Sequence, residues 1–414
     1  MTASFPAVPF QTVSLRLVSP RLASPRPVFF RTLPARTLRV VASVLTVAAG
    51  LAGCASAGRP AEPAAPTPAV TVPLATSMTT ANGQAWAIVA MGGSAADEDL
   101  FWELLTRQPG SSQWKLVTPP GVADNGGLVA AGTSGPLTVA FEPSQDLVFS
   151  PLAQTGDDGR TWGTGLLNAS LAAVPDALAT DGSGMLALLN DGAIDQAPAG
   201  RAASGDWAQL AAPGTLAASA AGRGCQVAGL TGVAYAPSGM VLAAASCARP
   251  GIAGIFARVA GTWRESGPAV SGGQVLRVVR LSQTPAGDTA LFQEGGSADA
   301  SLLAAWAGAD ARWTVSAALP LRGGEVEATG TGPGGALWVL LSGDRAQALA
   351  RPGAAWRRLP APPEGTATLA AGPHGGYQAL VVSGARLHVY RLASTGSWTA
   401  GQAISVPIQY GSSS

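Results

Sequence analysis

A tryptophan recurs seven times along this chain at a nearly constant interval. Each tryptophan follows a short polar or glycine-containing turn and precedes a short apolar stretch, at Trp114, Trp162, Trp207, Trp263, Trp313, Trp356 and Trp398. Successive spacings are 48, 45, 56, 50, 43 and 42 residues. A glycine-containing turn that leads into an apolar run alternates with them, at Gly83, Gly135, Gly184, Gly239, Gly287, Gly335 and Gly375. Two sequence features that alternate with the same period predict that one structural unit is repeated.

Each repeat holds apolar runs of strand length separated by turn residues. In the sixth repeat these runs cover 325–329, 336–341, 346–351 and 355–359. Four strands in about 47 residues is the size of a propeller blade, and one small sheet cannot bury both faces alone. We therefore predict an all-β fold, a seven-bladed β-propeller of four-stranded antiparallel blades over residues 78–414. The alternative is a β-sandwich or solenoid. The strand-like segments 70–74 and 404–408 could pair near the seam of the ring.

The second repeat carries the most specific motif. Thr155-Gly-Asp157-Asp-Gly159-Arg-Thr161-Trp162 resembles the Asp-box, or BNR repeat, of the sialidase superfamily. Asp157 can accept hydrogen bonds from amides within a tight turn, and Gly159 permits an unusual backbone conformation. In that family the box is a structural device of enzymes and binding proteins alike, so it implies the propeller fold and says little about function.

The N-terminal segment predicts where the protein resides. Six arginines and no acidic residue precede an apolar run over 40–51, too short to span a bilayer as a helix. The run ends in Leu51-Ala-Gly-Cys54, which resembles the lipobox of bacterial lipoproteins. The resemblance implies a signal peptide over 1–53 that is removed, a lipid on Cys54, and a location on the outer face of the cell membrane. An ordinary secretory signal is the alternative. Residues 54–77, rich in Ala and Pro, are predicted to be a linker.

Charge and cysteines narrow the class of protein. Six of the 25 basic residues lie within 1–53, so the remainder has 19 basic and 24 acidic residues, a net charge of −5. This argues against nucleic acid as a partner, because phosphate binding needs clustered positive charge. Cys225 and Cys247 flank a hairpin-like segment outside the cytoplasm, and we predict a disulfide between them.

No catalytic set is visible in the sequence. Sialidase chemistry requires several arginines, a Tyr–Glu pair and an Asp, together with an Arg-Ile-Pro motif that is missing from this chain. Among four tyrosines, Tyr235 is the best placed, on an innermost strand. His374 and His388 have no ligand partners at metal spacing, and the run 97–99 lacks the pattern of a calcium loop. We predict no catalytic residue, metal or cofactor.

Two neighbouring repeats place charge where innermost strands begin. Arg277 and Arg280 lie in the fifth repeat, and Glu325 and Glu327 lie in the sixth. The two glutamates would share a strand face, whereas only one arginine would face them in a regular strand. With Tyr235 these residues form our candidate channel patch, which would bind a ligand or simply hold an ion pair.

These observations favour a lipid-anchored, non-catalytic binding or scaffold protein of the cell envelope, with a protein, peptide or glycan as ligand. A sialidase-type glycoside hydrolase, or a degenerate descendant that retains sugar binding, is the alternative. A stabilising subunit of a membrane complex is a third hypothesis.

Overall fold

A computed structural model describes residues 75–80, 82–91, 101–119, 127–131, 137–141, 152–164, 175–270, 274–284, 287–296, 299–308, 310–343 and 345–406. All of them belong to one compact unit, Glu62–Ser414. The predicted signal peptide, Cys54, most of the linker and the acidic run 97–99 lie outside the described residues. No described helix is long and apolar enough to cross a membrane.

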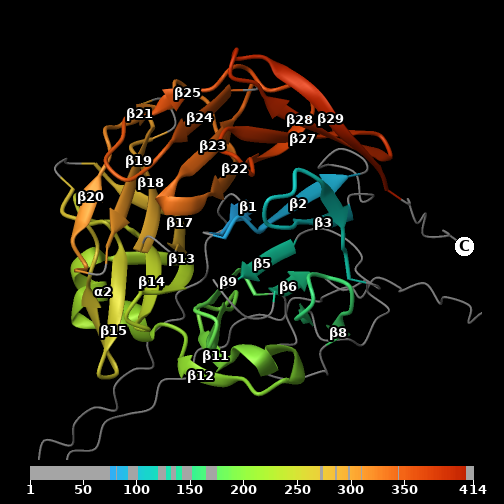
Figure 1. The fold of residues 1–414 in the computed structure, drawn as a ribbon. Helices are drawn as coiled ribbons and strands as arrows, with labels where there is room; N and C mark the ends of the chain where they lie inside the picture. The colour runs from blue at the N-terminus through green and yellow to red at the C-terminus, as the bar shows by residue number, and fades with distance from the viewer. Residues whose placement is uncertain are drawn as a thin grey trace, which may run out of the picture. The chain divides into compact units, whose positions relative to one another are not determined.

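The described strands fall into groups of four, each an antiparallel sheet with its strands in chain order (Figure 1). The first group is β1 (Ala75–Thr79), β2 (Ala85–Met91), β3 (Phe101–Arg107) and β4 (Trp114–Leu116). The second is β5 (Gly127–Ala131), β6 (Leu137–Phe141), β7 (Leu152–Thr155) and β8 (Gly163–Thr164). The third is β9 (Ala177–Thr180), β10 (Gly184–Leu188), β11 (Ile194–Pro198) and β12 (Ala208–Ala211). The fourth is β13 (Val227–Tyr235), β14 (Val241–Cys247), β15 (Ile255–Val259) and β16 (Thr262–Glu265).

The chain continues in the same way. The fifth group is β17 (Leu276–Thr284), β18 (Gly287–Glu294), β19 (Ser301–Ala307) and β20 (Trp313–Val315), and the short β21 (Leu319–Pro320) also pairs with β19. The sixth is β22 (Val326–Thr331), β23 (Leu337–Leu341), β24 (Arg345–Leu349) and β25 (Arg357–Arg358). The seventh is β26 (Thr366–Ala371), β27 (Tyr377–Ser383), β28 (Arg386–Leu392) and β29 (Trp398–Ser405). The predicted strands of the sixth repeat overlap all four observed ones.

The second strand of most groups is largely apolar because neighbouring sheets cover both of its faces. β23 (Leu-Trp-Val-Leu-Leu) is buried at every position. Each hydrophobic cluster joins two groups that follow each other in the chain. One further cluster joins Leu380 and Val389 of the seventh group to Val89 and Leu105 of the first. Four-stranded antiparallel sheets stacked face to face are a propeller-like arrangement, which confirms the predicted all-β class.

The repeated tryptophans connect consecutive groups. In four of them the indole N–H donates to a backbone carbonyl of the preceding group: Trp162 to Val117, Trp313 to Ser266, Trp356 to Ala317 and Trp398 to Pro360. Each acceptor lies three or four residues beyond the preceding tryptophan of the series. The sequence period is therefore the period of one inter-sheet contact.

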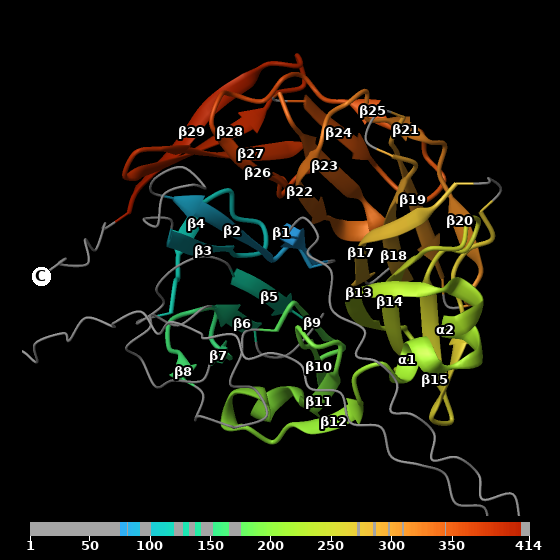
Figure 2. The ribbon, with the colours of Figure 1, turned by 180° about the vertical axis from the view of Figure 1, so that it is seen from behind.

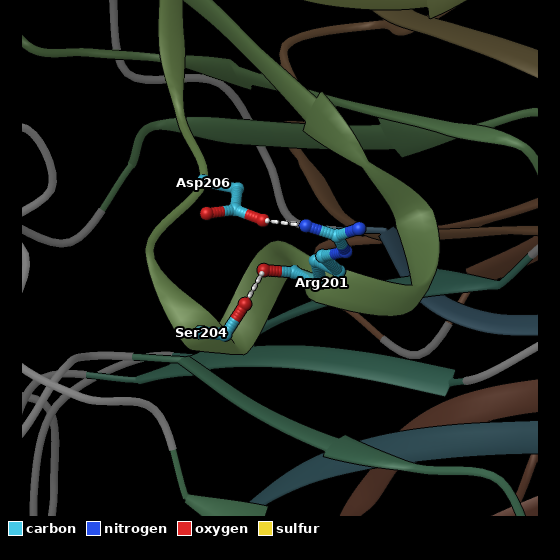
Figure 3. A network of polar contacts seen from close by, with 3 residues as sticks. All are labelled: Arg201, Ser204 and Asp206. Carbon is cyan, nitrogen blue, oxygen red and sulfur yellow. Dashed lines mark hydrogen bonds and ion pairs between the residues drawn. The ribbon is translucent and has the colours of Figure 1, made fainter.

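The third group makes this contact differently. Trp207 donates instead to Ala202 within its own group, in the 3-10 helix η2 (Ala199–Ser204). The exposed turn around η2 is closed by an ion pair of 2.8 Å between Arg201 and Asp206, and by a bond from Ser204 to the Arg201 carbonyl (Figure 3). Gln154 of the second group donates to the Ala199 carbonyl, so an amide side chain replaces the indole as the connection.

A helical insertion explains the longest spacing in the series. Between Trp207 and Trp263 the chain forms two short helices, α1 (Thr215–Ala218) and α2 (Ala220–Cys225), which no other group contains among the described residues. Cys225 ends α2, and its disulfide to Cys247 at the end of β14 confirms the predicted bridge. The hairpin of β13 and β14 is also confirmed, with Val227 opposite Cys247.

The chain ends do not pair with each other in the described residues. β1 pairs antiparallel with β2 and parallel with β22, which links the first and sixth groups into one eight-stranded sheet. β1 lies between these two strands in both views (Figures 1 and 2). β29 completes the seventh group by pairing with β28. Segment 70–74 and residues 407–408 lie outside the described residues.

Candidate functional site

Three strands from different groups meet at β1, and hydroxyl groups hold them together. The Thr76 and Thr368 hydroxyls are 2.6 Å apart, and Thr76 also donates to the Thr329 carbonyl at 3.3 Å. The Ser77 hydroxyl donates to the Leu369 carbonyl. All of these polar side chains are buried. Short hydroxyl side chains satisfy backbone carbonyls where strands of separate sheets converge, which larger apolar residues could not do.

A pocket of about 290 Å³ opens beside the first residues of β1. Six strands contribute to it, β1, β2, β3, β22, β23 and β26. Its lining residues are Thr76, Ile88, Val89, Ala90, Trp102, Glu327, Leu340, Thr366 and Ala367. The walls are thus largely apolar, and Glu327 is their one charged side chain. The indole N–H of Trp102 is buried and has no hydrogen-bond partner among the described residues.

A bulge in β17 places both predicted arginines on one side of the strand. The register of β17 against β18 shifts between Val278 and Arg280. Leu276 and Val278 pack toward the fourth group, so Arg277 points away from it. Arg280 donates to the Thr329 hydroxyl of β22 at 3.0 Å. A regular strand would have presented only one arginine to the sixth group, and the bulge presents both.

Arg280 is held rigidly in this position. Its side chain is 9 % exposed, and its Nε donates to the Ser282 hydroxyl at 2.7 Å. Burial lowers the pKa of the Arg280 guanidinium to about 10, so the group remains charged at neutral pH. A fixed cation therefore lies beside β22, bonded to Thr329, which is two residues along the strand from Glu327.

The two predicted glutamates do not form the regular pair we expected. Glu325 precedes β22, where its backbone N–H bonds the Ser342 hydroxyl. Glu327 sits at a second bulge, between Val326 and Ala328. Both glutamates are exposed, but only Glu327 lines the pocket. Strand alternation does not relate the two glutamates, because Glu325 precedes β22 and Glu327 lies at its bulge.

Tyr235 lies apart from this patch. It is the last residue of β13, whereas Arg277 is the second residue of β17. It is buried in the cluster between the third and fourth groups, with its hydroxyl against Gly184. Burial, together with the nearby Asp181 carboxylate, raises the pKa of Tyr235 to about 12. The structure therefore places Arg280 against β22, the strand that carries Glu327, and leaves Tyr235 in a different cluster.

The Asp-box-like residues form a closed turn between β7 and β8. Asp157 accepts from the Thr161 backbone at 2.9 Å, from the Thr161 hydroxyl at 2.6 Å and from the Thr155 hydroxyl at 2.8 Å. These bonds lower the pKa of the Asp157 carboxyl to about 2. Gly159 has a φ of +82°, and a Cβ there would lie 2.5 Å from the Val117 side chain. The turn thus presses against the first group, beside the carbonyl that accepts from Trp162.

No three His, Cys, Asp or Glu side chains cluster in the described part of the chain. His388 lies in β28, and His374 lies in the turn before β27. Sequence reasoning missed Thr76, Trp102 and Thr366, because only the insertion of β1 beside β22 brings them to one pocket.

No protein-family profile and no curated protein sequence matches the chain. Solved structures do resemble it. One described as YCF48 bound to D1 peptide is 13% identical, with a TM-score of 0.41 and coverage of 80% of this chain and 90% of that chain. The Pseudomonas aeruginosa periplasmic gluconolactonase PpgL is 13% identical, with a TM-score of 0.45 and coverage of 77% and 95%. TolB from Acinetobacter baumannii is 13% identical, with a TM-score of 0.35 and coverage of 78% and 65%. At such identities and TM-scores, the activities of these proteins do not transfer to this chain.

Proposed function

We propose that this chain is a lipid-anchored, extracytoplasmic binding protein without catalytic activity, and that its partner is a protein or peptide. In this proposal its seven sheet groups are the blades of one closed propeller. Closure is supported by the cluster that packs the seventh group on the first, and by the inter-sheet tryptophan bonds.

The pocket beside β1 is the observation that carries the binding function. It combines apolar walls with the Glu327 carboxylate. A peptide matches this mixture, because its backbone N–H groups can donate to the carboxylate while its side chains contact the apolar walls. Arg280 adds fixed positive charge beside β22, where it donates to the Thr329 hydroxyl.

The hydrolase alternative has weaker support. A sialidase-type site needs a tyrosine and a glutamate beside several arginines, and none of the described tyrosines lines the pocket that contains Glu327. Tyr235 is buried between the third and fourth groups, and Tyr377 and Tyr390 belong to β27 and β28.

Anchoring is supported by the lipobox-like Cys54 and by the signal-like segment before it. We expect Cys54→Ser to move the full chain from the membrane fraction to the soluble fraction. A variant that stays with membranes would contradict the anchor and leave the binding proposal to the next experiment.

Partner binding is tested by photo-crosslinking in cells. A benzophenone amino acid at Glu325, exposed beside the pocket, should crosslink one defined protein, and the same probe at Asp206 in the third group should not. Fluorogenic sialosides and other glycosides test the alternative. Turnover by the full chain that Tyr235→Phe abolishes would make the protein an enzyme and overturn our proposal.

A further inference from the structure

β29 differs from every other outermost strand of the described groups. It has eight residues, whereas β4, β8, β12, β16, β20 and β25 have between two and four. An outermost strand presents unpaired backbone N–H and C=O groups, and proteins usually limit that liability by keeping such strands short. Among the described residues, the seventh group instead offers a long edge with no strand paired to it.

The sequence of β29 leaves this edge unprotected. Trp-Thr-Ala-Gly-Gln-Ala-Ile-Ser contains no charged residue and no proline, the two residue kinds that commonly block edge pairing. Thr399, Ala400, Gly401, Ala403 and Ser405 are exposed. One bulge interrupts the pairing with β28, between the partners Val389 and Tyr390.

The direction of the backbone groups follows from one hydrogen bond. The Val406 N–H donates to the Ala385 carbonyl, which continues the antiparallel pairing of Ser405 with Arg386. Backbone groups alternate in an antiparallel pair, so Ser405 and Ala403 direct their N–H and C=O groups to the free edge. An extended chain laid alongside would find donors and acceptors in strand register.

Long side chains of β28 lie behind this edge. Leu387 and Val389 pack toward the first group, so Arg386 and His388 occupy the opposite face. Their cross-strand partners are the small Ser405 and Ala403. Because these partners are short, the exposed Arg386 side chain can extend over β29 to the position of an added strand.

The charge around β29 indicates which kind of peptide would bind at its edge. The seventh group, residues 366–406, contains two arginines, Arg386 and Arg391, and no acidic residue, although the chain after residue 53 is acidic overall. An added strand with carboxylates on the Arg386 face would complement that charge. Apolar docking has little support, since Val275 is the one large apolar side chain exposed among the described residues.

We propose that β29 accepts an extended, acidic peptide segment of the partner protein as an additional strand of the seventh sheet. This inference rests on the proposed function, because it takes the partner to be a protein. Backbone pairing would supply affinity, and Arg386 would favour acidic side chains on one face.

The test measures binding of a defined probe to the full-length protein by fluorescence anisotropy. The probe is a fluorescent ten-residue peptide in which Glu alternates with Val and Thr. A matched peptide has Lys in place of Glu, and two others are N-methylated along one or the other backbone edge. We expect the acidic probe to bind about tenfold more tightly than the Lys peptide. One N-methylated peptide should lose binding and the other should retain it.

Two matched variants locate the site. Ala403→Pro removes an N–H that points away from β28, so the sheet itself should tolerate it, whereas binding should weaken about tenfold. Ala403→Val keeps the N–H and should bind as the wild type does. Arg386→Gln should weaken the acidic probe about threefold and reduce its salt dependence. Thermal unfolding of each variant checks that the fold is intact.

Three outcomes would overturn the proposal: equal binding to Ala403→Pro and the wild type, equal binding of both N-methylated peptides, or no binding of the acidic probe. A concentration-dependent dimer that Ala403→Pro abolishes would place a second copy of this chain on the edge and would also overturn it. Each outcome leaves the proposed function open to its own test, because crosslinking from Glu325 does not depend on β29.

Discussion

The Gln402 side chain pairs with the backbone of Trp114 in both directions. Gln402 Nε2 donates to the Trp114 carbonyl, and the Trp114 N–H donates to Gln402 Oε1, each at 2.8 Å. These residues lie 288 positions apart, in the last and first sheet groups. A side-chain amide thus imitates a backbone strand partner where the seventh group meets the first. Among the described residues, no strand from one end of the chain joins the other end there.

Gln402→Ala tests that seam. Loss of both bonds should lower the free energy of unfolding by about 2 kcal/mol, because the Trp114 N–H loses its partner in a partly buried place. Urea denaturation measures the change. Thr399→Ala, in the same strand, removes an exposed bond to the Arg391 carbonyl and should have a much smaller effect. Equal effects of the two substitutions would show that Gln402 has no special role in closing the structure.

The inter-sheet bonds of the tryptophans predict that Trp→Phe substitutions differ in their cost in stability. Trp313→Phe keeps an aromatic ring but removes the bond of 2.6 Å to the Ser266 carbonyl, which should cost about 1 kcal/mol of stability. Trp356→Phe removes a longer, more exposed bond of 3.1 Å to Ala317 and should cost less. Chemical denaturation of both variants checks the order, and a larger loss for Trp356→Phe would contradict it.

The same tryptophans show why the sequence predicted so much of the fold. Their spacing follows inter-sheet contacts, which four of the indole N–H groups make with the preceding group, so the period survives even where the surrounding motif has been lost. The third group is an exception, because the Gln154 side chain beside η2 makes the inter-sheet bond that an indole makes elsewhere.

The candidate site was predicted less well. Bulges at Arg280 and Glu327 change which way side chains point, and nothing in the local sequence signals them. Thr76 joined the pocket only through pairing between β1 and β22, which lie about 250 residues apart.

The disulfide should contribute measurably to stability. Cys225 and Cys247 enclose a separation of 22 residues, for which loop-closure entropy gives about 3 kcal/mol. The double variant Cys225→Ala and Cys247→Ala should therefore unfold at a lower urea concentration than the oxidised protein. Reduction of the wild type should produce a similar loss, which separates the bridge from side-chain packing. A thiol reagent should label neither residue until a reductant is added.

Asp288 predicts how stability depends on pH. It is 4 % exposed in β18, its Oδ1 has no hydrogen-bond partner among the described residues, and burial raises its pKa to about 7 from the usual 3.8. The folded state therefore binds this proton more tightly than the unfolded state does. The resulting stability is fully present below about pH 4, and it is lost as pH rises through about 7. Asp288→Asn has no proton to lose at this position. Its free energy of unfolding should therefore exceed that of the wild type by about 4 kcal/mol at most at pH 8, and should match it near pH 4. Urea denaturation across this range measures the difference, with the exposed Asp299→Asn as control. If Asp288→Asn differs from the wild type in stability by the same amount at pH 4 and pH 8, the Asp288 carboxyl does not titrate between these pH values. A contact with another group, and not a bound proton, would then offset the cost of burying it.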